Sequence, residues 1–220
     1  MPHNTVNSSQ TSTPAPRRAA RRAGLATTAA TALAALAAAS APAAAAGSTD
    51  TAVQRSPEGG RHCAVVYFDL GETLVHTEDD GSLHYLPEAA RHLRELREAD
   101  VEVGLITNVP PEWGETDAER AAKLREIVDA DWTGTSPFAW EDFEGRILTP
   151  RTVEERKPSP ALFERGSGAA HGCHVVYQGE TAKELEVARK EGYFTYAVGR
   201  EGAWPAYLPV PVIEAIAQLP

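Results

Sequence analysis

Apolar residues between positions 62 and 220 follow two alternating patterns. Short, nearly continuous apolar runs have the length and composition of buried strands and lie at 63–68, 101–106, 146–148, 174–177 and 194–198. Segments with apolar residues at helical spacing lie between and after them, at 87–99, 116–130, 160–165, 181–191 and 211–218. Strands that alternate with helices are typical of a parallel, doubly wound sheet. The pattern therefore predicts an α/β fold, a Rossmann-like sheet of about five strands.

Local signals place the turns and the helix ends. Residues 74–85 carry Asp79-Asp80-Gly81 between short apolar flanks, which predicts a hairpin. Residues 131–145 are irregular and rich in aromatic residues. The helix signals are Pro87 at a first turn, Thr116 with Glu119 and Thr181 with Glu184 as capping boxes, Ser159 as N-cap before Pro160, and Gly192 as a stop.

Polar residues follow three of the predicted strands. Asp69 ends the first, Thr107 and Asn108 follow the second, and Gln178-Gly179-Glu180 follow the fourth. In open parallel sheets, ligands bind beyond the carboxyl ends of the strands. The sequence therefore places a candidate site at this edge of the sheet.

The first part of the chain has a different composition. Residues 1–46 combine a polar start, Arg17-Arg18-Ala19-Ala20-Arg21-Arg22 and an uncharged Ala-rich stretch, the parts of a secretory signal. Arg21-Arg22-Ala23-Gly24-Leu25 also resembles a twin-arginine export motif, so we expect export; the alternative is a disordered leader on a cytoplasmic protein. Ala and Thr dominate the stretch, which disfavours a stable membrane span. Residues 47–61 have the composition of a linker, and 62–220 form the predicted domain.

Charge and cysteine content exclude several classes of function. The chain has a formal net charge of −10, and its basic leader makes the remainder more acidic still. An acidic surface repels phosphate backbones, so we expect no nucleic-acid partner. Two cysteines are too few for a disulfide scaffold or a four-ligand zinc site, and the seven histidines lack metal-binding spacing.

Four short motifs occur in a fixed order at the predicted strand ends. They are Asp69-Leu70-Gly71-Glu72-Thr73, Thr107, Lys157-Pro158 before a helix, and Gly179-Glu180-Thr181-Ala182-Lys183-Glu184. Singly each has a simpler interpretation: a strand-to-turn exit, a loop start, a solvated lysine, a helix cap. Together they resemble the haloacid dehalogenase (HAD)-like hydrolases, most of which are phosphatases, across residues 63–220.

The resemblance implies a role for each motif. Asp69 would attack phosphorus and form an aspartyl-phosphate. Thr107, Asn108 and Lys157 would bind the phosphate and balance its charge. Asp69, the Gly71 main-chain carbonyl, Glu180 and Glu184 would hold Mg²⁺, with Glu184 acting directly or through water.

The sequence departs from the family pattern at two positions. Most phosphatases of the family have a second Asp two residues after the nucleophile, as general acid and base; here the residue is Gly71. The next carboxylate, Glu72, points to the opposite side of an extended segment and is an uncertain substitute. The fourth motif has Glu180 in place of Asp. We therefore expect either a Mg²⁺-dependent phosphatase with unusual acid chemistry, or a degenerate member that binds a phosphorylated ligand or partner without turnover.

The family's large cap domain does not fit between the motifs. Residues between Asp69 and Thr107 are used by the hairpin and a helix, and those between Thr107 and Lys157 leave little more room. We expect a nearly capless domain whose open site suits a bulky substrate or closure by a protein partner.

The two cysteines precede strands that the family places side by side. Cys63 and Cys173 would lie at the amino ends of neighbouring strands, about 4.8 Å apart, so a disulfide is feasible. Two buried reduced thiols are the alternative.

Overall fold

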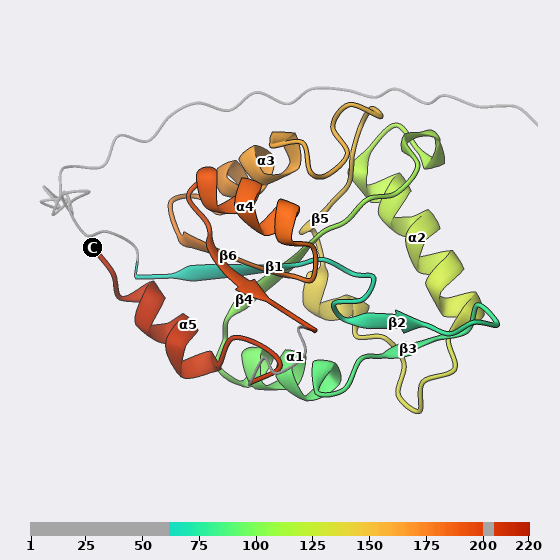
Figure 1. The fold of residues 1–220 in the computed structure, drawn as a ribbon, viewed down its shortest axis with the longest axis horizontal. Coiled ribbons are helices and arrows are strands. Elements are labelled where there is room, and N and C mark those ends of the chain that lie inside the picture. Colours follow the sequence, from blue (N-terminus) through green and yellow to red (C-terminus); the bar gives the residue numbers. More distant parts are fainter. Residues whose placement is uncertain (1–61, 200–204) are drawn as a thin grey trace, which may run out of the picture. The chain divides into compact units, whose positions relative to one another are not determined.

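The computed structural model describes residues 62–199 and 205–220. The export leader and linker predicted for 1–46 and 47–61 lie outside this range. The predicted fold class is confirmed. A five-stranded parallel sheet has the order β5-β4-β1-β6-β7, and helices cover both of its faces (Figure 1). The strands are β1 (Ala64–Phe68), β4 (Glu102–Ile106), β5 (Ile147–Leu148), β6 (His174–Gly179) and β7 (Phe194–Ala197).

Two layers of helices bury the sheet. On one side lie α1 (Ala89–Glu98) and α5 (Val210–Ala217), and on the other lie α3 (Ala161–Ala169) and α4 (Ala182–Lys190) (Figure 1). The central strand β1 is buried along its whole length, with alternate residues in the two cores. Its five apolar residues therefore form a strand that needs no polar face.

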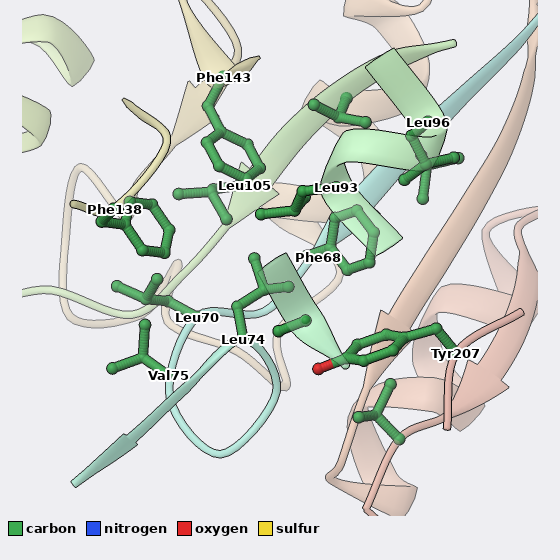
Figure 2. Close-up of a cluster of buried hydrophobic side chains, with 14 of the residues drawn as sticks. Phe68, Leu70, Leu74, Val75, Leu93, Leu96, Leu105, Phe138, Phe143 and Tyr207 are labelled. Atoms are coloured by element: carbon green, nitrogen blue, oxygen red, sulfur yellow. The ribbon is translucent and has the colours of Figure 1, made fainter. Parts of the chain in front are cut away.

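The core on the α1 side is aromatic and aliphatic. Figure 2 shows Phe68 from β1 and Leu105 from β4 packed against Leu93 of α1, with Phe138 and Phe143 closing one end. The last of these belongs to η2 (Trp140–Phe143), a short helix in the segment expected to be irregular. Most of the aromatic residues of that segment are thus core.

Two insertions flank the candidate site. The predicted hairpin is β2 (Val75–Thr77) paired antiparallel with β3 (Leu83–Tyr85), and it follows β1 directly. Between β4 and β5 lie η1 (Pro111–Trp113), α2 (Asp117–Asp131) and η2. Neither insertion is a large cap, as predicted. Within the described ranges, no helix is long and apolar enough to cross a membrane.

The predicted helix caps are partly wrong. The capping box of Thr116 and Glu119 is present at α2. At α3, however, Pro160 itself occupies the N-cap without a side-chain bond, so Ser159 is not the cap. At α4, Thr181 makes no side-chain cap bond, and its hydroxyl donates to the Glu180 carboxylate instead.

The structure decides the state of the cysteines. Cys63 and Cys173 form a disulfide, with their Cα atoms 4.9 Å apart. The cause is the sheet register: β1 and β6 are paired, and Ala64 lies beside His174. The alternative of two reduced thiols is not what the structure shows.

Candidate functional site

Asp69 lies directly beyond the central strand, on the turn that begins the hairpin. Its main-chain N–H donates to the carbonyl of Gln178 in β6 (3.0 Å), which extends the sheet by one residue. The side chain is 13% exposed. Its Oδ1 atom accepts from the N–H of Leu70 (2.7 Å) and receives the Lys157 ammonium (2.8 Å). One carboxylate oxygen is therefore held by two donors at the edge of the sheet where ligands bind.

Lys157 reaches Asp69 from a distant loop, and Asn108 holds its backbone. The Lys157 N–H donates to the Asn108 Oδ1 atom (2.8 Å), and the Asn108 Nδ2 atom donates to the Lys157 carbonyl (3.1 Å). Both ends of this amide are thus committed to one residue. The side chain of Asn108 thus holds the Lys157 backbone, and phosphate binding by Asn108 stays a prediction.

The Lys157 ammonium is almost fully buried and has three neighbours. Its Nζ atom lies 2.8 Å from Asp69 Oδ1, 2.8 Å from Glu184 Oε2 and 2.9 Å from the Tyr177 hydroxyl. An ammonium has three N–H donors, so this geometry uses all of them. Burying the charge is tolerable only because each donor is satisfied.

Glu184, in the first turn of α4, is a partner of Lys157. Its Oε2 atom receives the Lys157 ammonium and accepts a hydrogen bond from Tyr177 (2.9 Å). The Glu184 side chain is thus used in this pair, and the capping box expected with Thr181 does not form. Glu184 was also expected to hold the metal, but its Oε2 atom is committed to this pair.

Tyr177 lies in β6 beneath the ammonium, and its hydroxyl is shielded from water. Burial is the main reason that the pKa of this hydroxyl lies well above its ordinary value. The nearby negative charges of Asp69 and Glu184 raise the pKa further. The phenol therefore stays protonated at physiological pH. It can accept from the ammonium while it donates to the carboxylate.

Thr107 and Glu180 follow the strands on either side of β1. Thr107 comes after β4, is buried, and donates its N–H to the Leu148 carbonyl (3.1 Å). Glu180 comes after β6, and its Oε2 atom accepts from the Thr181 hydroxyl (2.8 Å). The charge of Glu180 also acts on the Tyr177 hydroxyl. Both residues thus lie at the carboxyl edge that carries Asp69.

Gly71 and Glu72 form the turn after Asp69. A side chain at Gly71 would meet no atom within 4 Å, so there is open space where the family usually has its acid. Glu72 points away: its carboxylate accepts from the Thr77 N–H (3.2 Å) and pairs with His76 (2.8 Å), and half of its side chain is exposed. The geometry gives Glu72 a role in the hairpin.

The charges at this edge do not cancel. Asp69, Glu180 and Glu184 carry three negative charges against the single positive charge of Lys157. Among the described residues, no three His, Cys, Asp or Glu side chains are grouped as ligands of one ion.

Sequence inspection missed the part played by Tyr177. It is the last large residue of a buried strand, where aromatic residues are common. The available signal was that a buried phenol needs a hydrogen-bond partner, and the partner lies in elements that only the fold brings near.

Comparison with known proteins gives a likeness in fold. No family model and no curated protein matches the chain. Among solved structures, it is similar to a HAD family enzyme from Bacteroides thetaiotaomicron, a mutant in complex with magnesium and inorganic phosphate (14% identity, 65% of this chain and 97% of that chain, TM-score 0.46). It is also similar to D,D-heptose 1,7-bisphosphate phosphatase from B. bronchiseptica, complexed with magnesium and phosphate (17% identity, 61% of this chain and 80% of that chain, TM-score 0.44).

A third similar structure is CbbY from Rhodobacter sphaeroides in complex with phosphate (13% identity, 64% of this chain and 88% of that chain, TM-score 0.45). HAD enzymes are thus among the structures that this fold resembles. At these identities and TM-scores the likeness is distant, and it assigns neither a substrate nor a reaction to this chain.

Proposed function

We propose that this protein is a Mg²⁺-dependent phosphoric monoester hydrolase of the HAD type, with Asp69 as nucleophile. The observation that supports this most is the pairing of Asp69 with Lys157 at the carboxyl end of the central strand, at 2.8 Å. A reactive carboxylate at this position lies where a ligand of a parallel sheet binds. Thr107 and Glu180 end the two neighbouring strands.

The proposed reaction has two steps. In the first, an oxygen of the Asp69 carboxylate forms a bond to phosphorus while the bond to the ester oxygen breaks, and that oxygen leaves with the electron pair. In the second, water attacks the aspartyl-phosphate, releases inorganic phosphate and restores Asp69. Lys157 and the Thr107 hydroxyl would stabilise the negative charge on the phosphoryl oxygens.

The site needs a cation before it can favour a phosphate. With three carboxylates against one ammonium, it would repel a phosphate dianion. The Asp69 carboxylate, the Gly71 carbonyl and Glu180 are oxygen donors of the kind that Mg²⁺ takes, and Glu184 could contribute through water. Bound there, Mg²⁺ would supply positive charge at the transferring phosphoryl group.

Gly71 leaves the proton for the leaving group without a source in the protein. The leaving oxygen would then depend on solvent, so esters with acidic leaving groups should react best. The same absence favours the second candidate function, in which the chain binds a phosphorylated ligand or partner without turnover.

Turnover of p-nitrophenyl phosphate with Mg²⁺ tests the proposal. Asp69→Asn removes the nucleophile with little change of shape and should abolish hydrolysis. Asp142→Asn is the matched control, since Asp142 is also paired with a cation, with Arg97 Nε 2.6 Å from its Oδ1 atom, but lies away from the site. Equal activity in wild type and Asp69→Asn would rule out the proposed nucleophile. An inert wild type that binds phosphate would favour the binding function.

We also propose export through the leader at residues 1–46. The disulfide supports this, because such bonds persist in oxidising compartments. Replacing Arg21 and Arg22 by Lys should retain the protein inside the cell, as seen by fractionation. Unchanged distribution would contradict a twin-arginine signal.

A further inference from the structure

We infer that Tyr177 is a positioning residue of the proposed phosphatase: its hydroxyl fixes Lys157 and Glu184 so that the third ammonium N–H points at Asp69. The inference rests on the proposed function and adds a residue that no motif of the sequence includes. Three observations support it: the closed geometry of the polar atoms, the packing of the ring, and the need for glycine at position 179.

The polar atoms form a closed triangle. Lys157 Nζ lies 2.9 Å from the Tyr177 hydroxyl and 2.8 Å from Glu184 Oε2, and the hydroxyl lies 2.9 Å from the same Oε2. The phenol's single proton goes to the carboxylate, and its lone pair faces the ammonium. The hydroxyl therefore has one hydrogen-bond direction, which orients both charged groups.

This triangle leaves one N–H donor of the Lys157 ammonium for Asp69. Two of the three ammonium N–H groups are used within it, and the third meets Asp69 Oδ1 at 2.8 Å. The Leu70 N–H approaches the same oxygen. Both donors fall on Oδ1, so the carboxylate of Asp69 is held through this one oxygen.

The Tyr177 ring is fixed by its packing. It is fully buried, and the Phe163 ring of α3 meets it edge-on at a centroid distance of 5.0 Å. The Lys157 ammonium lies 5.5 Å from the centre of the Tyr177 ring. A ring held in this way cannot swing its hydroxyl away from the two charges.

Gly179 provides room for the hydroxyl. A Cβ atom at this position would lie 3.0 Å from the Tyr177 ring and 3.1 Å from its hydroxyl oxygen. Those contacts are tighter than side chains normally tolerate. A side chain at position 179 would therefore crowd the phenol, which ties Tyr177 to the fourth motif.

The test compares two tyrosine variants by isothermal titration with inorganic phosphate in the presence of Mg²⁺. Tyr177→Phe removes only the hydroxyl at the site. Tyr193→Phe is the matched control, because its hydroxyl is also buried and donates to the Phe163 carbonyl (2.7 Å) outside the site. We expect Tyr177→Phe to weaken phosphate binding about tenfold or more, the range of one hydrogen bond to a charged group. The control should change it less than about twofold.

A double-mutant cycle separates positioning from a general structural effect. If Tyr177 acts through Lys157, the effect of Tyr177→Phe should vanish in a Lys157→Met background, while Tyr193→Phe stays additive. Should Lys157→Met bind no phosphate, the cycle is run with Glu184→Gln.

The outcomes distinguish the two levels of the proposal. Wild type that neither binds nor hydrolyses phosphate esters would overturn the proposed function, and this inference with it. Wild type that binds phosphate, with equal affinities in Tyr177→Phe and Tyr193→Phe or full additivity in the cycle, would overturn the role of Tyr177 alone.

Discussion

In the part of the chain that the structure describes, the two buried cations Arg120 and Lys157 are balanced differently. Arg120 of α2 is 1% exposed, as is the side chain of Lys157. The Arg120 guanidinium donates to the Gly114 carbonyl (2.7 Å), the Thr149 hydroxyl (2.8 Å) and Asp117 Oδ1 (3.0 Å). Gly114 and Asp117 lie before and at the start of α2, and Thr149 follows β5, so Arg120 joins the insertion between β4 and β5 to the segment after β5.

The surroundings of the two cations differ in net charge. Around Arg120, Asp117 is shared with a second cation, Arg165, whose other neighbour is Glu155 (3.5 Å). Positive and negative charges are thus equal in that network. Lys157 is instead outnumbered by carboxylates, one of which is partly exposed. A balanced network holds a structure together, whereas an unbalanced one at a sheet edge has charge left for a ligand.

The largest expected effect is on activity, at Lys157. Lys157→Met should lower kcat/KM for p-nitrophenyl phosphate by about 10³-fold, because a donor to the developing charge is lost. Lys190→Met is the control, since Lys190 is two-thirds exposed and pairs with Glu186 on the surface of α4. A near-normal kcat/KM in Lys157→Met would contradict the functional role given to Lys157 in this comparison.

The second effect is on stability, at Arg120. Arg120→Met leaves buried acceptors without a donor and should cost about 3 kcal/mol of unfolding free energy, measured by urea denaturation. The control Arg125→Met removes an exposed arginine of the same helix and should cost less than about 1 kcal/mol. Activity per folded molecule should stay near that of wild type. Loss of activity without loss of stability would place Arg120 in the site.

The third effect tests whether the site lacks an acid. Because a side chain at Gly71 meets open space, Gly71→Asp should fold normally. It should raise turnover of alkyl phosphates about 10²-fold, the lower range of general acid catalysis, and change p-nitrophenyl phosphate much less. Gly168→Asp on α3 is a control for added charge, since a side chain there also meets no atom within 4 Å. Equal gains for both ester classes would contradict a missing proton donor.

The smallest effect is the acid sensitivity of the Arg120 network. Burial raises the pKa of Asp117, but hydrogen bonds from Arg165 and Thr149 outweigh this effect and hold the pKa below its ordinary value. A carboxyl with a lowered pKa stabilises the fold above its ordinary pKa and loses that contribution as the pH falls through the lowered value. Urea denaturation between about pH 5 and pH 2 should show this loss. Asp117→Asn should flatten it, and an equally steep curve in that variant would exclude Asp117.

Much of the fold could be predicted from local patterns. The apolar runs predicted all five strands, and Asp79-Asp80-Gly81 gave the hairpin turn where Gly81 has a positive φ of 87°. Predictions failed where a side chain had a choice of partners. Glu184 could cap its own helix or pair with Lys157, and the pair formed because it neutralises a buried ammonium. The contact of the Asn108 amide with the Lys157 backbone could not be read from the sequence, because the two residues are far apart in the chain.

The sequence by itself determined the order of strands and helices along the chain. It also placed Asp69, Thr107 and Glu180 directly after strands, and Lys157 before a helix. These features depend on residues near one another in the chain, where periodicity and turn chemistry act. The tertiary structure decided which distant groups meet: Cys63 with Cys173, and Lys157 with Tyr177 and Glu184. Such contacts depend on sheet register and on packing between layers. Burial then selects the pairings, because a charge removed from water must find its partners inside the fold.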